Sequence, residues 1–442
     1  MSVQGEPRIR SRFSDFVDPE FGIVGHVQEL LREPGAPSFF HFGSRACNTS
    51  AFSQYRNFRD AGGASANRDT ALLKAVGEAV ERYCSALYCS DRLTLCAYRD
   101  IQADAVRPSD WALFSDSQYS SDGFPWKRFQ DDTLVRWCPA IDVESRRQTL
   151  VPASRVYMPY FFDEGIGEVA IDQPISTGLA CHESLERALV AGACEVIERD
   201  AIMLCWLTKY VPRRIDHKSL GEQNRDLVRR FQDAKFIVDV FAITMDHGIP
   251  VCIATIRGDI PSLPGLVVAG ACSLDPDEAV RKSLEELAHT NLQCRLLQRR
   301  LGALTASSPD FPEVRDQAGH LRFYLDPRNV KCASYLFESS DKVDFREIES
   351  PKTGTPAGDL EVLCKRITGT GNRILAVDLT TPDVQEIGLF VVRAMIPGFH
   401  PLHLGHGNRS LGGNRIRSAL MRVGNREGDQ WLRVNPYPHP YP

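Results

Sequence analysis

Several features that would place this chain in a familiar class are missing from its 442 residues. No apolar run approaches the roughly 18 residues that a membrane-spanning helix needs, and residues 1–16 contain no apolar signal-peptide core. The 13 cysteines include no Cys-x-x-Cys pair, and the P-loop sequence Gly-x-x-x-x-Gly-Lys-Ser/Thr does not occur. We therefore expect a cytoplasmic protein with no membrane partner, whose thiols are reduced and mostly buried.

An excess of positive charge is also missing. The chain has 52 Lys and Arg against 57 Asp and Glu, a formal net charge of −5. This balance gives no electrostatic reason to expect a nucleic acid as partner. With 43% hydrophobic residues the chain can bury a substantial core, either in one large domain or in two to three smaller ones.

One pattern occurs in three stretches predicted to be helices, 69–87, 182–209 and 276–300. An alanine is followed at offsets four, seven and ten by a small residue, a glutamate, and a second glutamate or a histidine, which places all four on one helix face. The three sets are Ala71, Ala75, Glu78 and Glu81; Ala188, Gly192, Glu195 and Glu198; and Ala279, Ser283, Glu286 and His289. Three copies in one register indicate an internal repeat.

The repeated glutamates indicate a metal site. Two carboxylates about 6 Å apart on one helix face repel by roughly 3 kcal/mol at an effective dielectric near 20, so several pairs in one place need cations between them. Mg²⁺ prefers such oxygen ligands. The alternative is that each pair lies on a solvated face beside Arg82 or Arg199, but a solvated face needs no small residues. We predict one metal site, formed by Glu78, Glu81, Glu195, Glu198 and Glu286.

Helical and β-rich stretches alternate along the chain, which favours an α/β or α+β fold over a helix bundle. Residues 15–31 are expected to form a strand or turn that leads into a short helix. Residues 56–69 are predicted to be a Gly- and Ala-rich turn whose amides can bind an anion. Short strands are expected over 91–172, and loops with one or two short helices over 302–356.

Two features near the end of the chain stand out. Four prolines alternate with other residues in NPYPHPYP, so this tail forms neither a helix nor a central strand. His400, His403 and His406 are spaced by three, but the proline and glycines between them rule out a regular helix. Loop histidines are therefore favoured over a metal site. Residues 369–371, Gly-Thr-Gly, are predicted to be a helix C-cap turn.

The motifs GEAVERYC and STGLACHESLERALVAGACEVIERDA, the segments LAVDLTTPDV and FVVRAMIPGFHPL, and the terminal NPYPHPYP together resemble the YcaO family, in particular its azoline-forming peptide cyclodehydratases. The resemblance extends from about residue 13 to residue 442. It implies one large YcaO-type domain at 51–430, with mixed sheets and an internal pseudo-repeat around an ATP site. A lead-in at 1–50 and a Pro-rich tail at 431–442 would flank this domain.

The resemblance further implies that ATP and Mg²⁺ are bound by the five glutamates named above, with His289 as a further nucleotide contact. The chain departs from the family pattern in three places. GGASA stands where the family often has a Gly-Lys-Gly turn, Lys74 and Ala191 replace polar residues four before the first glutamates, and His289 replaces a common glutamine. These departures affect the expected nucleotide contacts rather than the metal ligands.

The reaction implied is ATP-dependent conversion of Cys, Ser or Thr in a ribosomally made precursor peptide to thiazoline or oxazoline. The resemblance assigns the tail a catalytic role, through Pro438, His439, Pro440 and Pro442, with the terminal carboxylate or His439 as base. It implies an E1-like partner for leader binding and a separate flavin dehydrogenase where rings are oxidised, and it leaves a homodimer open. Thioamide or amidine formation and a non-catalytic peptide-binding scaffold are the alternatives.

Overall fold

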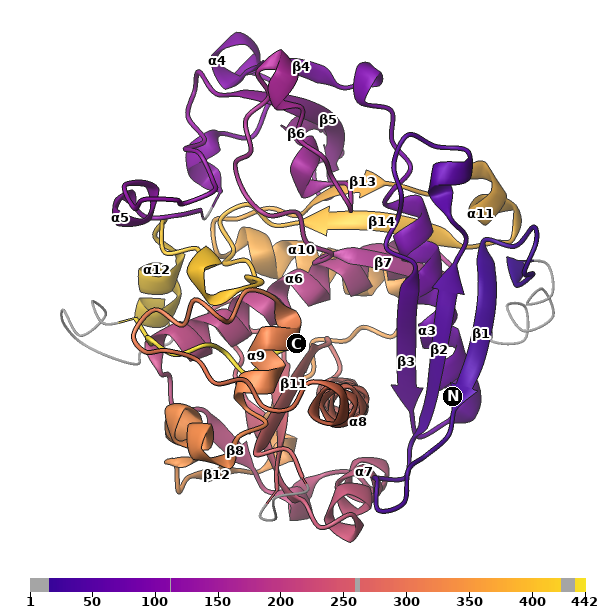
Figure 1. Ribbon diagram of the computed structural model, residues 1–442, viewed down its shortest axis with the longest axis vertical. Coiled ribbons are helices and arrows are strands. Elements are labelled where there is room, and N and C mark those ends of the chain that lie inside the picture. The colour runs from indigo at the N-terminus through magenta and orange to yellow at the C-terminus, as the bar shows by residue number, and fades with distance from the viewer. Residues whose placement is uncertain (1–15, 112, 259–262, 423–433) are drawn as a thin grey trace.

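The computed structural model describes residues 16–111, 113–258, 263–422 and 434–442 (Figure 1). Its architecture is mixed α/β, as predicted. The described strands form three sheets. The first sheet is antiparallel in the order β1-β2-β3, with β1 (Val24–Leu30), β2 (Phe40–Ala46) and β3 (Asp60–Ser65).

The other two sheets follow paths that do not match the sequence order. One has the order β11-β10-β9-β8-β12, with β8 (Arg213–Ile215), β9 (Ile237–Ala242), β10 (Val251–Arg257), β11 (Leu266–Cys272) and β12 (Lys342–Val343). The last has the order β4-β5-β13-β14-β7, and β6 pairs with β5. Its strands are β4 (Thr94–Ala97), β5 (Leu134–Asp142), β6 (Gln148–Pro152), β7 (Leu179–His182), β13 (Leu375–Asp378) and β14 (Phe390–Met395).

The three helices predicted from the repeated pattern are present as α3 (Arg68–Cys84), α6 (Leu185–Thr208) and α8 (Pro276–Arg300). Each begins where a side-chain oxygen accepts a hydrogen bond from an otherwise unpaired amide of the first turn, namely at Asn67, Ser184 and Asp275. The last of these starts is reinforced by a proline at the first helical position.

Each of these helices packs against two of the three sheets, in a cyclic arrangement. Helix α3 packs on β3 of the first sheet and on β7, α6 packs on β14 and on β11, and α8 packs on β11 and on β3. The small residues of the repeated face are buried in these contacts, for example Ala71, Ala188 and Ala279. The repeat therefore brings three helix faces toward one another.

The sequence 56–69 is not the turn that was predicted, because residues 60–65 form strand β3. Glycine has low strand propensity, but here it allows close approach of strand and helix. A Cβ on Gly63 would lie 2.5 Å from the carbonyl oxygen of Ala71 and 2.6 Å from the amide nitrogen of Ala75, both on α3. The short helix expected at the end of 15–31 was also wrong, since Val24–Leu30 is β1 and pairs with β2.

The remaining helices surround this core. They are α4 (Tyr98–Ile101), α5 (Asp116–Tyr119), α7 (Glu222–Asp233), α9 (Gln317–Phe323), α10 (Pro356–Thr368), α11 (Pro382–Glu386) and α12 (Arg415–Arg422). Helix α10 ends in the predicted C-cap turn, with Gly371 at a φ of 81°. None of the helices in the described ranges is both long and apolar enough to cross a bilayer.

The Pro-rich tail lies inside the molecule, and the C-terminus is at the centre of the view in Figure 1. Hydrogen bonds hold its described part, 434–442, against α6 and α9. Trp206 Nε1 donates to the Tyr437 carbonyl at 3.0 Å, and Tyr324 Oη donates to the Pro438 carbonyl at 2.7 Å. Residues 431–433 of the predicted tail lie outside the described residues.

Candidate functional site

The two glutamates of α3 each accept a hydrogen bond from a strand amide, and the two strands belong to different sheets. Glu78 Oε2 accepts from Gly62 N of β3 at 2.9 Å, and Glu81 Oε1 accepts from Cys181 N of β7 at 2.8 Å. Because the two positions lie three residues apart on one helix face, one pair of carboxylates connects both sheets to the helix.

Helix α6 repeats this arrangement. Glu195 Oε2 accepts from Gly178 N at 3.0 Å, directly before β7, and Glu198 Oε2 accepts from Cys272 N of β11 at 3.1 Å. A strand amide occupies one oxygen of each of the four carboxylates and orients it. The other oxygen of Glu78, Glu195 and Glu198 accepts from a side chain, namely Arg82, Arg199 and Tyr441 respectively.

The pKa values show that these carboxylates form one cluster. Burial raises the pKa of Glu81 well above its usual range, and the charges of Glu78 and Glu195 add to this effect. Burial likewise raises the pKa of Glu198 to about 7, with further contributions from Glu195 and Glu286 that Arg199 opposes. Carboxylates from all three repeat helices therefore act on one another, as the repeated pattern suggested.

Two arginines accompany the cluster at equivalent positions of the repeat. Arg82 donates to Glu78 at 2.8 Å and Arg199 donates to Glu195 at 3.1 Å, each from the position four residues later. The side chains of Arg82 and Arg199 are only 16% and 18% exposed, so these are not the solvated helix faces that were the alternative. Both pairs lie in partly buried surroundings.

A third arginine, Arg393 of β14, was missed by the sequence analysis, although a charged residue in a buried strand is an unusual signal. Burial lowers its pKa to about 10, while the nearby Glu195 opposes that shift. It donates to the carbonyls of Arg155 and Ile175. Its Nη1 is buried without an acceptor within the described structure, as are Arg82 Nη1 and Arg199 Nε.

This set of groups fits a magnesium–nucleotide complex. Clustered carboxylates whose charges help to raise the pKa of Glu81 and of Glu198 favour a hard divalent cation, which takes oxygen ligands. Buried guanidinium N–H groups without acceptors favour an anion with several oxygens, such as a phosphate chain. The metal-ligand roles of Glu78, Glu81, Glu195, Glu198 and Glu286 remain predictions.

His289 lies on the α3 side of the cluster. An ideal Cβ on Gly62, whose amide binds Glu78, would be 2.6 Å from His289 Cε1. The rings of His289 and His41 lie 6.4 Å apart, and Nδ1 of each is buried without a partner within the described structure. The predicted nucleotide contact of His289 is untested, but the residue borders the acidic cluster.

A salt bridge that the sequence analysis did not anticipate connects α8 to α3. Lys74 Nζ lies 2.7 Å from Glu285 Oε2, and Ser65 Oγ donates to the same carboxylate at 2.6 Å. Lys74 had been noted only as a departure from the family pattern. The structure shows it holding two of the repeat helices together.

The tail reaches the cluster through a residue that was not among the predicted ones. Tyr441 Oη donates to Glu198 Oε1, and the Arg199 guanidinium lies 5.1 Å from the centre of the Tyr441 ring. Of the predicted tail residues, His439 is buried and bonded to other segments, while Pro438 and Pro440 flank it. Their catalytic roles remain predictions.

Asp200, the residue after the second motif, lies outside the acidic cluster. Its carboxylate binds the Arg415 guanidinium at 2.6 Å and accepts from His400 N at 2.7 Å. It therefore holds α12 and the loop after β14 against α6.

Comparison with known proteins identifies the family. The profile described as YcaO cyclodehydratase, ATP- and Mg²⁺-binding, matches residues 62–400, which include every glutamate of the cluster. The chain belongs to the YcaO family. Members of this family bind ATP and Mg²⁺, as the carboxylates and arginines of the cluster suggest.

Two relatives agree with this family assignment, and their names state no activity. An uncharacterized protein of Methanothermobacter thermautotrophicus is 26% identical over 81% of this chain and 85% of its own length. An uncharacterized protein in the tfuA 3′ region of Rhizobium leguminosarum bv. trifolii is also 26% identical, over 60% of each chain.

Solved YcaO-type structures share the fold. A heterocyclase in complex with substrate and cofactor superposes with a TM-score of 0.80 at 19% identity, over 99% of this chain and 57% of that one. YcaO from Methanopyrus kandleri, bound with AMPPCP and Mg²⁺, gives a TM-score of 0.63 at 20% identity over 90% of each chain. The present chain therefore spans little more than half of the heterocyclase.

Proposed function

We propose that this protein is an ATP-dependent cyclodehydratase that converts Cys, Ser or Thr of a ribosomally made precursor peptide to thiazoline or oxazoline. The observation that carries the proposal is the acidic cluster, in which buried carboxylates lie beside buried guanidinium N–H groups without acceptors, in a chain of the YcaO family. These groups match what phosphoryl transfer requires, namely metal ligands and charge-stabilising donors around one phosphate chain.

In the proposed reaction the peptide side chain attacks the preceding amide carbonyl, the resulting oxyanion is phosphorylated by ATP, and loss of phosphate leaves the ring. Bound Mg²⁺ would neutralise charge on the transferred phosphoryl group. The glutamates named above would hold the ion, with strand amides fixing the orientation of four of them. Arg82, Arg199 and Arg393 would donate to phosphate oxygens.

The tail would complete the site. Its contact with Glu198 through Tyr441 supports a role beside the acidic cluster, because a tail packed elsewhere would not reach α6. The terminal carboxylate or His439 is the proposed base. Deleting the last five residues should abolish ring formation, whereas retained activity would reject this role.

Partners follow from the same proposal. The substrate is a precursor peptide, captured through an E1-like leader-binding protein, and a flavin dehydrogenase acts where the rings are oxidised. One structural neighbour is the Escherichia coli microcin synthetase complex with its pro-peptide bound, with a TM-score of 0.62 at 14% identity. That complex supports the idea that YcaO-type subunits work together with other chains.

Mass spectrometry of a candidate peptide incubated with this protein, its partner and Mg-ATP tests the proposal. One water should be lost per modified residue, and replacing that Cys, Ser or Thr with Ala should prevent the loss. Exchange of oxygen for sulfur would indicate thioamide formation instead, and water loss that survives the Ala replacement would indicate an amidine.

Nucleotide binding separates an enzyme from a non-catalytic scaffold. Calorimetric titration should show Mg-ATP binding by the wild-type protein and its loss in Glu195→Ala, because that carboxylate lies in the cluster. Absent binding in the wild type, or unchanged binding in the variant, would reject the site.

A further inference from the structure

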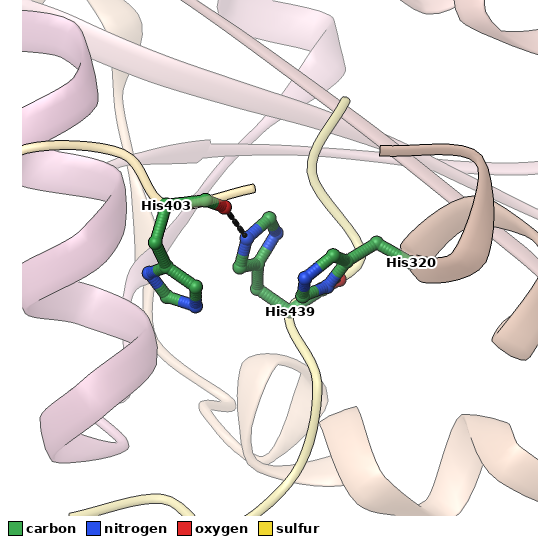
Figure 2. A group of neighbouring side chains, drawn as sticks. All are labelled: His320, His403 and His439. Carbon is green, nitrogen blue, oxygen red and sulfur yellow. Dashed lines mark hydrogen bonds between the residues drawn. The ribbon is translucent and has the colours of Figure 1, made fainter. Parts of the chain in front are cut away.

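Three histidines from distant parts of the chain meet in the interior (Figure 2). They are His320 on α9, His403 in the loop after β14, and His439 in the tail, and they are 0%, 4% and 1% exposed. One nitrogen from each lies within 4.8 Å of the others. In the part of the chain that the structure describes, no other His, Cys, Asp and Glu side chains form such a group.

Two backbone carbonyls determine the tautomers of two of these rings. His320 Nδ1 lies 2.9 Å from the His439 carbonyl, and His439 Nε2 lies 3.0 Å from the His403 carbonyl, as Figure 2 shows for the latter pair. Because a carbonyl only accepts hydrogen bonds, each of these nitrogens carries the proton. The other nitrogen of each neutral ring, His320 Nε2 and His439 Nδ1, then presents a lone pair.

His320 Nε2, His439 Nδ1 and His403 Nδ1 are all buried without a hydrogen bond of standard geometry. The backbone of Tyr441 is a hydrogen-bonding neighbour of the His439 ring, which the ion would have to displace from Nδ1. Unsatisfied buried polar atoms are rare in native proteins and need an explanation. Metal-binding histidines have this arrangement, with one nitrogen free for the ion and the other donating to a carbonyl.

We propose that His320, His403 and His439 bind one divalent transition-metal ion of the zinc type, which anchors the tail to α9 and to the loop after β14. Three imidazole nitrogens without thiolate or carboxylate suit zinc, and also cobalt or nickel, rather than magnesium or calcium. Burial keeps the rings neutral, the form that binds metal, since it lowers the pKa of His439 to about 4 and those of His320 and His403 well below their usual range.

Binding requires a small rearrangement of the rings. Nitrogen ligands of a tetrahedral zinc ion lie about 3.3 Å apart, whereas the three nitrogens here lie within 4.8 Å of one another. The His320 and His439 rings are stacked, with centroids 3.8 Å apart and planes at 15°, and they must tilt to direct both lone pairs at one ion. The fourth ligand position is left to water.

The proposal affects two neighbouring assignments. Tyr441 follows His439 by two residues and binds Glu198, so the ion would fix the tail close to the acidic cluster. A His439 ring with Nε2 bonded to the His403 carbonyl and Nδ1 bound to metal has no nitrogen left to act as base. Metal binding by His439 and its proposed catalytic role therefore exclude each other.

The test uses the full chain without a histidine tag. After treatment with a chelator and dialysis, the protein is loaded with Co²⁺ or Zn²⁺, and bound metal is counted by elemental mass spectrometry. We expect one ion per chain, a tetrahedral cobalt spectrum without a thiolate charge-transfer band, and a lower melting temperature after chelation. A dissociation constant for the metal above the protein concentration used would overturn the proposal. So would a thiolate charge-transfer band in the cobalt spectrum.

Substitutions test which histidines bind the metal. His320→Ala and His403→Ala should each weaken cobalt binding at least about tenfold, whereas His247→Ala, which removes a buried histidine outside the group, should retain the wild-type spectrum. An unchanged spectrum in both cluster variants would reject the site. If those variants do not fold, X-ray absorption of zinc-loaded wild-type protein decides, because it must show three imidazole ligands. None of these measurements depends on the proposed ring formation.

Discussion

Helices α3 and α6, two of the three repeat helices, carry similar carboxylate pairs in different surroundings, which we refer to as the α3 half and the α6 half of the acidic cluster. In the α3 half, Glu81 has one oxygen on a strand amide and its pKa is raised well above the usual range. In the α6 half, Glu198 has the same kind of amide contact but also accepts from Tyr441 of the tail. The comparison indicates that the repeat provides two similar pairs of predicted metal ligands, and that the described part of the tail donates a hydrogen bond to the α6 pair.

The largest effect is expected from neutralising one carboxylate of either half. Glu81→Gln and Glu198→Gln should each lower ring formation at least about 100-fold, because a ligand for the phosphoryl-bound metal is lost. Both variants should melt close to wild type without nucleotide, since burial already favours the neutral form of both carboxyl groups.

Activity by mass spectrometry and thermal melting measure the two effects. Glu186→Gln, on the exposed first turn of α6, is the matched control and should change neither. If only one of the cluster variants lost activity, the halves would not be equivalent as metal ligands.

The close approach of β3 and α3 should be the next most sensitive feature. Gly63→Ala places a Cβ against backbone atoms of α3 at 2.5 and 2.6 Å, which should lower the free energy of unfolding by about 3 kcal/mol. Gly77→Ala, in the interior of α3, has open space around the new Cβ and should raise the free energy of unfolding by about 0.5–1 kcal/mol. Urea unfolding measures both, and equal values would show that glycine at residue 63 is not required for packing.

The tail contact should have a smaller effect. Tyr441→Phe leaves a buried oxygen of Glu198 without its donor, and we expect a loss of about 1–2 kcal/mol in the free energy of unfolding. Tyr437→Phe, in the same tail, is the control and should have less than half of this effect. A loss of similar size in both would mean that the Glu198 contact adds nothing specific to the α6 half.

Lowering the pH should reduce the stability of the α3 and α6 regions over the same pH range. Burial lowers the pKa of His41, on β2 beside α3, and of His247, close to Asp200 of α6, to about 4. Below the unfolded value near 6.5 the unfolded chain takes up protons that the folded chain does not, so stability is complete above pH 6.5 and is lost as the pH falls toward 4.

Replacement of His247 by Gln should reduce the slope of stability against pH by about 1.4 kcal/mol per pH unit within that window. Urea midpoints measured from pH 7 to 5 test this expectation. A slope equal to that of wild type would mean that His247 is already charged in the folded protein.

The three repeat helices could be predicted because their small-residue faces are local signals. The prediction of a turn at residues 60–65 was wrong, since glycine there allows contact with a helix rather than chain reversal. Arg393 and Lys74 could not be assigned, because their roles depend on carboxylates contributed by other elements. Tyr441 was missed for the same reason.

The repeat, its glutamates, the mixed α/β class and the family can be recognised without a structure, because helical spacing and short motifs are contained within a few turns of chain. Which groups meet depends on contacts between segments that are distant in the chain. The cyclic packing of α3, α6 and α8 between three sheets brings Glu78, Glu195 and Glu286 into one cluster. Contacts among α9, the loop after β14 and the tail join His320, His403 and His439, whose separation along the chain leaves no local signal.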